Sequence, residues 1–113
     1  MKRVIAVVKP NMLDDVIFAL HRIDDFPGAT MTEVRGIGRG FRRKMEAERD
    51  SPSVGYPEQI RIEVICRDDQ LEEIVATIEQ KAHTGKSGDG KIFISPVEET
   101  VRISSGQRGD EAI

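Results

Sequence analysis

Cysteine, tryptophan, a basic excess and long hydrophobic runs are scarce or missing in this sequence, and each absence excludes a class of protein. The single cysteine, Cys66, excludes an internal disulfide framework and a cysteine-based zinc site. His21 and His83 lie far apart and lack the spacing of metal ligands, so we expect no metal site. No stretch approaches the ~20 apolar residues of a membrane-spanning helix, which favours a cytoplasmic protein with no direct membrane insertion. The net charge of −3 argues against a nucleic-acid partner, which usually requires a basic excess.

The length and the remaining composition predict one globular domain over residues 1–113. A chain of 113 residues has the size of one ordinary domain and can bury one core. With 38% hydrophobic residues it is too apolar for a disordered chain. Because aromatic residues make up only 4%, the core must consist of valine, isoleucine, leucine and methionine.

Hydrophobic periodicity predicts strands and helices in alternation. A continuous apolar run predicts a buried strand at 4–8, after which Asn11 is expected to cap a helix that stops at Pro27-Gly28. Asp68 or Asp69 is expected to cap a second helix. The other predicted strands are 30–37, 59–66, 91–95 and 97–103, and the polar tail over 104–113 is expected to be mobile.

The order β-α-β-β-α-β predicts an α+β, ferredoxin-like fold with an antiparallel sheet and both helices on one face. Val7, Glu63 and Ile65 alternate onto the other face, and the sequence offers no further helix to cover it. We therefore expect self-association rather than a monomer.

Residues 38–58 form a long segment without a clear period between the second and third predicted strands. The segment contains glycine, proline and serine together with a dense mixed-charge run from 39 to 50. Such a run is usually solvated surface, but a long loop in so small a domain is often functional, which favours docking of a partner.

The segment from Thr84 to Lys91, TGKSGDGK, is the sharpest candidate for an anion site. Its three glycines let backbone amides approach an anion, and its two lysines suit a phosphate chain. It is not a P-loop, because Ile92 replaces the serine or threonine and the loop follows a helix and enters a strand. The simpler alternative is a glycine at the end of the helix followed by a tight turn.

Two further features are open to two interpretations. Residues 36–40, GIGRG, either release the chain from a strand or hold a phosphate, and they lack the dinucleotide spacing. Arg102, between Val101 and Ile103, is either solvated or, beneath another subunit, in need of an anionic partner.

No arrangement of nucleophile and base is present. Cys66 is most simply a small buried strand residue, and Glu98-Glu99 is a weak acid/base candidate. We therefore expect no catalytic residues and no enzyme activity.

The segment from Thr84 to Val97 closely resembles the glycine-loop signature of the PII nitrogen-regulatory signal proteins. The same family is resembled by Lys9-Pro10 with the following LDDV, by residues 32–39 (TEVRGIGR) and by the final DEAI. The similarity extends over the whole chain, and residues 38–58 are close in length to the family's T-loop.

The resemblance implies a homotrimer that binds ATP or ADP in clefts between subunits and docks its T-loop on a membrane transporter or metabolic enzyme in nitrogen regulation. The glycine loop, 84–91, would hold the phosphates, with Arg102 reaching in from the neighbouring subunit. The nucleotide-binding residues implied are Thr30, Gly36, Ile37, Gly38, Arg39, Gly40, Ile65, Gly88, Asp89, Gly90, Lys91, Arg102, Ile103 and Ser104. The residues implied for partner docking are Phe41, Arg42, Arg43, Lys44 and Arg49.

Several positions depart from the family's pattern, which indicates a divergent member. The family's glutamine that helps to hold Mg²⁺ and 2-oxoglutarate is Gly40 here, and the lysine that pairs with 2-oxoglutarate is Gln59. The positions that are modified covalently in some members are Pro52 and about Asp50, and Ser104 replaces a second phosphate-binding arginine. The resemblance therefore supports ATP or ADP, allows Mg²⁺ and does not support 2-oxoglutarate.

Three other functions remain as alternatives to the nucleotide-gated regulator. One is a related regulator of carbon or metal transport that does not sense 2-oxoglutarate. The second is a weak nucleotide hydrolase, which lacks a positioned base. The third is a metal-tolerance protein of the same trimeric fold, which the lack of cysteine and histidine clusters disfavours.

Overall fold

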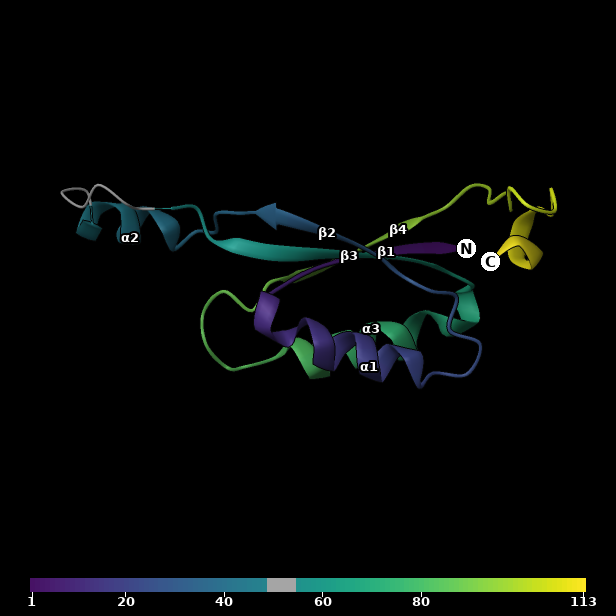
Figure 1. Ribbon diagram of the computed structural model, residues 1–113, viewed down its shortest axis with the longest axis horizontal. Helices are drawn as coiled ribbons and strands as arrows, with labels where there is room; N and C mark the ends of the chain where they lie inside the picture. The colour runs from purple at the N-terminus through teal and green to yellow at the C-terminus, as the bar shows by residue number, and fades with distance from the viewer. Residues whose placement is uncertain (49–54) are drawn as a thin grey trace.

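The computed structural model describes residues 1–48 and 55–113 and shows a four-stranded antiparallel sheet with two helices on one face (Figure 1). The strands are β1 (Lys2–Val8), β2 (Thr30–Arg35), β3 (Glu58–Cys66) and β4 (Lys91–Pro96), in the order β2-β3-β1-β4. Helices α1 (Leu13–His21) and α3 (Leu71–Ala82) pack against each other along this sheet. The ferredoxin-like fold class is thus confirmed.

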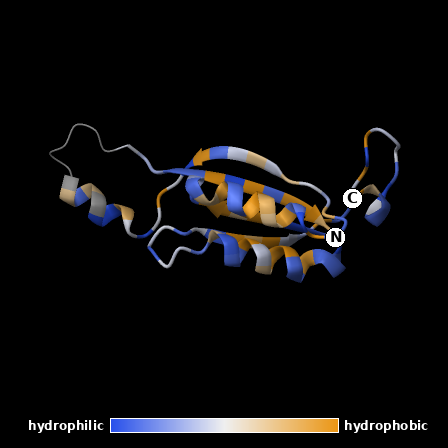
Figure 2. Ribbon diagram, turned by 60° about the horizontal axis from the view of Figure 1, so that its bottom comes forward, coloured by the Kyte–Doolittle hydropathy of each residue, from blue (hydrophilic) through white to orange (hydrophobic). Residues whose placement is uncertain are grey.

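The core lies between the sheet and the two helices, where hydrophobic residues of both layers face each other (Figure 2). Alternate residues of the two central strands and one stripe of each helix are buried, and burial of a large aliphatic side chain contributes about 1.5–3 kcal/mol. The most deeply buried side chains are Val4, Val8, Val16, Leu20, Ile62, Val64, Cys66, Ile74 and Ile78. As expected, no aromatic side chain is among the buried core residues described.

The opposite face of the sheet has no covering layer in the described chain. Val7, Glu63 and Ile65 alternate with buried neighbours and lie on this face, as predicted. Phe93, which pairs with Ile5 on the adjacent strand, shares this face and is 55% exposed. Self-association through this face stays a prediction.

Both predicted helix caps are wrong. A 3₁₀ turn at Pro10–Met12 precedes α1, so Asn11 lies inside a turn that Pro10, with its fixed φ, begins one residue earlier. A second 3₁₀ turn at Asp68–Gln70 precedes α3, where the backbone amide of Arg67 donates to Gln70 Oε1 at 3.2 Å. Neither aspartate therefore serves as the helix cap.

The C-terminal region also differs from the prediction. Residues 97–103 do not form a strand; the region has only an isolated bridge between Val101 and Arg108. The tail is not an open chain either, because it turns back and ends in a 3₁₀ helix at Gly109–Ala112 that buries Ala112. The turn is closed by local backbone hydrogen bonds, which polar composition does not reveal.

The predicted unpatterned segment between β2 and β3 contains a helix, α2 (Phe41–Glu48). Within it, Arg42 and Glu46 form an i,i+4 ion pair at 3.2 Å, which adds a small stabilisation to the helix. In Figure 1, α2 and the C-terminal segment project from opposite ends of the sheet. Their projection explains why the radius of gyration is 16.7 Å, against about 13 Å for a compact chain of this length.

No helix among the described residues has the length and apolar character needed to cross a membrane.

Candidate functional site

The glycine loop connects the end of α3 to the start of β4 and is folded tightly against the end of β1. Gly85, Gly88 and Gly90 all have positive φ, a conformation that other residues rarely adopt. A Cβ atom on Gly90 would lie 1.6 Å from the carbonyl oxygen of Val7. The prediction of a glycine at the helix end is wrong, because α3 ends at Ala82 and its C-cap is His83 in an extended conformation. Gly90 is the position at which a close approach of two backbones requires glycine.

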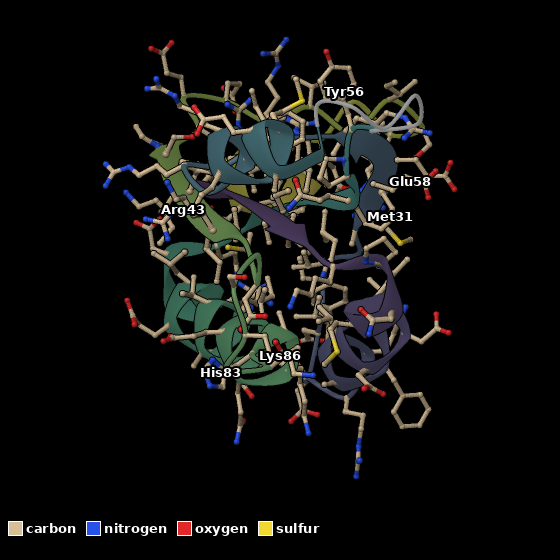
Figure 3. The ribbon with its side chains drawn as sticks, turned by 90° about the vertical axis from the view of Figure 1, so that its left-hand side faces the viewer. Met31, Arg43, Tyr56, Glu58, His83 and Lys86 are labelled. Atoms are coloured by element: carbon tan, nitrogen blue, oxygen red, sulfur yellow. The ribbon has the colours of Figure 1, made fainter. Side chains whose placement is uncertain are left out.

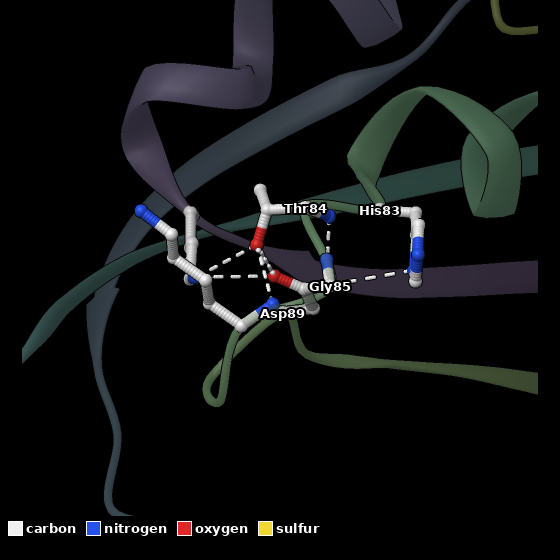
Figure 4. A network of polar contacts seen from close by, with 6 residues as sticks. His83, Thr84, Gly85 and Asp89 are labelled. Atoms are coloured by element: carbon white, nitrogen blue, oxygen red, sulfur yellow. Dashed lines mark hydrogen bonds and ion pairs between the residues drawn. The ribbon is translucent and has the colours of Figure 1, made fainter.

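A polar cluster, which we call the Asp89 cluster, joins the two ends of this loop (Figure 4). It consists of Lys9, Thr84, Gly85 and Asp89. The Asp89 carboxylate accepts from the amides of Thr84 (2.8 Å) and Gly85 (3.1 Å) and from the Thr84 hydroxyl, and Lys9 Nζ lies 3.0 Å from it. These partners, with Thr84 first, hold the pKa of the Asp89 carboxyl well below its usual range.

Lys91 begins β4 and pairs with Val7 of β1, so its position is set by the sheet register. Beside it, a cavity of about 370 Å³ opens between α3 and the β1–β4 pair, with Asp89, Gly90 and Lys91 in its wall. Lys86 and Lys91 are exposed. The loop can thus offer amides and two ammonium groups to an anion.

The stem of the β2–β3 connection lies at the same end of the sheet, as the view of that end in Figure 3 shows for Arg43, Tyr56, His83 and Lys86. Arg35 braces the stem by donating to the Tyr56 carbonyl at 2.9 Å and to Glu58 at 3.0 Å. Phe41 stacks on Tyr56 with ring centroids 5.7 Å apart.

The segment 36–40 follows β2 and opens this stem. Gly36 donates to the carbonyl of Pro57 at 3.2 Å, whereas Gly38 and Gly40 have open space where a side chain would lie. The predicted residues Ile37, Gly38, Arg39 and Gly40 are all exposed. Of the predicted docking residues, Phe41, Arg42, Arg43 and Lys44 lie in α2. Arg49 lies outside the described residues, as do the predicted positions Asp50 and Pro52.

A second group of predicted residues meets at the other end of the sheet. Thr30, Ile65 and Arg102 line a cavity of about 470 Å³ together with Thr100 and the C-terminal residues. The Arg102 guanidinium donates to the Ile113 carbonyl at 3.2 Å. Ile103 is fully exposed and Ser104 is exposed, both in the turn that follows.

One copy of the chain does not bring the two groups of predicted residues together. Ile65 on β3 pairs with Arg3 on one edge of β1, and Lys91 on β4 pairs with Val7 on the other edge. Arg3 and Val7 are four residues apart along β1. Four residues along and two strand spacings across separate the backbones of Ile65 and Lys91 by roughly 16 Å. Arg39 is also separated from Thr30, because Thr30 begins β2 and Arg39 follows the last residue of that strand, Arg35.

Sequence reasoning missed two members of the Asp89 cluster as site residues. Lys9 and Thr84 are present in the motifs quoted above, but neither is among the individual residues predicted to bind the nucleotide. Lys9 is far from Thr84 and Asp89 in the sequence, so no periodic pattern connects the three residues. They meet only because β1 packs beside the glycine loop. Cys66, by contrast, is buried as expected, and burial raises the pKa of its thiol.

Comparison with known proteins identifies the family of this chain. A family model described as "Nitrogen regulatory protein P-II" matches residues 1–107. The chain is 43% identical over 113 residues to "Nitrogen regulatory protein P-II" of Azospirillum brasilense and 41% identical to the protein of that name from Microchaete diplosiphon. It is 39% identical to "Nitrogen regulatory protein GlnK" of Escherichia coli strain K12, and each of these comparisons covers 100% of both chains. The chain therefore belongs to the P-II family of nitrogen regulatory proteins.

Proposed function

We propose that this P-II protein binds ATP or ADP at one shared site between adjacent copies of a homotrimer. The bound nucleotide then sets the conformation of residues 38–58, which dock on a membrane transporter or a metabolic enzyme. Family membership makes the chain a regulatory protein rather than an enzyme. The ligand, the trimer and the docked partner are the parts that we propose.

The glycine loop supports a polyphosphate ligand through its charge and its shape. Positive φ values at Gly85, Gly88 and Gly90 fold the loop into a compact turn, and the side chains of Lys86 and Lys91 are exposed on it. Charge-assisted hydrogen bonds of this kind are stronger than neutral ones and suit phosphate oxygens.

The separation of the two residue groups is the observation that carries the proposal. Thr30, Ile65 and Arg102 lie on one side and Lys91 with the glycine loop on the other, roughly 16 Å apart across the sheet. A cyclic assembly places unlike surfaces of neighbouring copies against each other. In such a ring, the Arg102 group of one copy would face the glycine loop of the next, and each cleft would receive one complete set.

The stem of the β2–β3 connection supports nucleotide control without 2-oxoglutarate. Gly40 supplies no side chain toward a metal ion, and Gln59 supplies no positive charge. A Mg²⁺ ion that accompanies ATP would depend on the phosphate oxygens for ligands. The stem therefore responds to whether the nucleotide is ATP or ADP, through Arg39 and the glycines beside it.

A complementation experiment tests whether the site is shared between copies. Lys91→Ala and Arg102→Ala are purified separately, and each should bind ATP weakly because every cleft lacks one residue. The two variants are then unfolded together and refolded as a mixture. A mixed trimer contains one cleft with wild-type Lys91 from one copy and wild-type Arg102 from its neighbour, so tight ATP binding should return at about one site per mixed trimer.

Three results would contradict the proposal. If light scattering shows a monomer at micromolar concentration, the proposed trimer is wrong. A mixture that binds no more tightly than its two components places Lys91 and Arg102 in separate sites or in one copy. If calorimetry shows no heat when ATP or ADP is added to the wild-type protein, the proposed ligand is wrong.

A further inference from the structure

We propose that Asp89 is a positioning residue that shapes the glycine loop before the nucleotide arrives, and that its carboxylate does not contact the nucleotide. The inference rests on the proposed nucleotide site and deepens it, because it changes the role of one of the residues that the family resemblance places against the phosphates.

Both carboxylate oxygens of Asp89 are occupied within the chain. Oδ1 is bound by the Thr84 hydroxyl and lies 3.0 Å from Lys9 Nζ. Oδ2 accepts from the amides of Thr84 at 2.8 Å and Gly85 at 3.1 Å, and His83 Nδ1 lies 3.6 Å away. The side chain is 23% exposed, so these contacts are partly shielded from water.

The chemistry of the ligand also argues against direct contact. A carboxylate beside a polyphosphate repels it, unless a metal ion or a proton lies between them. Here the negative charge of Asp89 is matched by Lys9 on the protein side of the loop. The carboxylate thus takes the place of an anion for the first amides of the loop, while Lys86 and Lys91 remain exposed to a ligand.

The Asp89 cluster joins the start of the glycine loop to its end by hydrogen bonds and so fixes the conformation of the segment between them. Thr84 and Asp89 are five residues apart, and Lys9 ties them to the end of β1. Thr84 Oγ1 also accepts from the amide of Lys86 at 3.2 Å, which orients the next residue of the turn. A glycine-rich segment is costly to order, so a loop that is already ordered should bind its ligand more tightly.

Asp89→Asn separates this role from the alternatives by the sign of its effect. If the carboxylate merely lay near the phosphates, its neutralisation would strengthen ATP binding. If it positions the loop, the variant should weaken ATP binding by roughly tenfold, despite the lost negative charge. Glu98→Gln, which removes the same charge from an exposed residue beyond β4, is the matched control and should leave affinity within about twofold.

Amide hydrogen exchange in the nucleotide-free protein supplies the second readout. In Asp89→Asn, exchange of the Thr84 and Gly85 amides should become roughly tenfold faster, while the core amides of β1 and β3 stay protected. Saturating ATP should restore protection in the loop. Thr84→Val, which removes the hydroxyl and keeps the amide, should show the same changes to a smaller extent, and Thr84→Ser should behave as wild type.

The combination of readouts distinguishes the possible failures. Tighter or unchanged ATP binding by Asp89→Asn overturns the positioning role. Weaker binding with unchanged exchange in the free protein also overturns it, because Asp89 would then act on the ligand directly. Should Asp89→Asn not fold, Thr84→Val and Thr84→Ser decide by the same criteria. Wild-type protein that binds no nucleotide rejects the proposed function instead, whatever the exchange rates are.

Discussion

The two glycine-rich segments look alike in sequence and are used in opposite ways. In the glycine loop, Gly85, Gly88 and Gly90 all have positive φ, and Gly90 touches the backbone of β1. In residues 36–40, no glycine has positive φ, and Gly38 and Gly40 border open space. The first segment needs glycine for its fold, whereas a side chain would fit at Gly38 and Gly40 of the second, although not at Gly36, where a Cβ would lie 2.3 Å from Gln59 Oε1.

This difference separates a rigid element from an adaptable one. The glycine loop is tied by the Asp89 cluster and by the close approach to Val7. The stem around 36–40 is held by the exposed Arg35–Glu58 pair, one aromatic stack and two hydrogen bonds, to the carbonyls of Tyr56 and Pro57. Exposed ion pairs contribute only about 0–1 kcal/mol, so the stem can change conformation at low cost. We expect the loop to recognise the ligand and the stem to respond to it.

The largest effect should come from Gly90→Ala. The new Cβ would lie 1.6 Å from the Val7 carbonyl oxygen and would force a positive φ on alanine. We expect the free energy of unfolding to fall by about 2–4 kcal/mol, since both backbone strain and a displaced strand end contribute. Urea unfolding at a fixed protein concentration measures this.

Gly38→Ala is the matched control, because the added Cβ meets no heavy atom within 4 Å. Its free energy of unfolding should stay within ~0.5 kcal/mol of wild type. Equal destabilisation by the two alanine variants would show that the segments do not differ as described.

Lys91→Ala should have the next largest effect, on binding rather than on stability. Loss of one charge-assisted hydrogen bond to a phosphate, worth about 1.5–3 kcal/mol, should weaken ATP binding by roughly tenfold to a hundredfold. Lys81→Ala removes an exposed charge of the same sign from the last turn of α3, outside the loop itself, and should bind as wild type. Calorimetry with ATP decides between these outcomes, and equal affinities for all three proteins would refute the assignment.

A gain of function tests the open space at Gly40. In wild-type protein, 2-oxoglutarate should not increase ATP affinity, because Gly40 and Gln59 offer neither a metal-side ligand nor a positive charge. The double variant Gly40→Gln, Gln59→Lys should fit, since a Cβ at Gly40 meets nothing within 4 Å. We expect 2-oxoglutarate to tighten its binding of Mg-ATP by roughly tenfold.

The matched control is the single variant Gln59→Lys, which adds the charge without the metal-side group. Titration of 2-oxoglutarate into each Mg-ATP complex gives the comparison. Saturable micromolar binding by wild-type protein would mean that another residue of the stem or of α2 replaces the missing lysine.

The smallest effect should be that of lowering the pH from 7 to 5 on the hydrogen-exchange protection of the glycine loop. Hydrogen bonds from Thr84, together with Lys9 and Gly85, lower the pKa of Asp89, and His83 is the other titratable group beside it. A carboxyl group with a lowered pKa in the folded state stabilises that state above its unfolded pKa of about 3.9 and ceases to do so as the pH falls through the lower value. Between pH 7 and 5 we therefore expect no loss of protection at the Thr84 and Gly85 amides.

Hydrogen exchange, corrected for the intrinsic dependence on pH, measures this protection. The variant His83→Gln removes the neighbouring imidazole and should give the same result. Protection that disappears above pH 5 in His83→Gln would show that the carboxylate is not held in its charged form.

Much of the fold could be predicted from the sequence, because each prediction rested on a local pattern. The alternation at 59–66 and the helical stripes that include Val16, Leu20, Ile74 and Ile78 reflect which side of an element is buried, and the structure has the same residues in its core. The order of elements then restricted the topology to the observed sheet. Helix caps, the helix α2 and the C-terminal turn were missed, since their hydrogen bonds depend on a few polar residues without a period.

The candidate site shows where sequence by itself stops. Composition and the TGKSGDGK motif predicted one domain and a candidate anion-binding loop, since length, glycine content and charge are properties of the sequence alone. Only the tertiary structure decided that Lys9, Thr84 and Asp89 meet, that a Cβ at Gly90 would clash with Val7, and that Arg102 and Lys91 lie at opposite ends of the sheet. The physical reason is that these contacts join residues brought together by strand register and helix packing, which no short stretch of sequence contains.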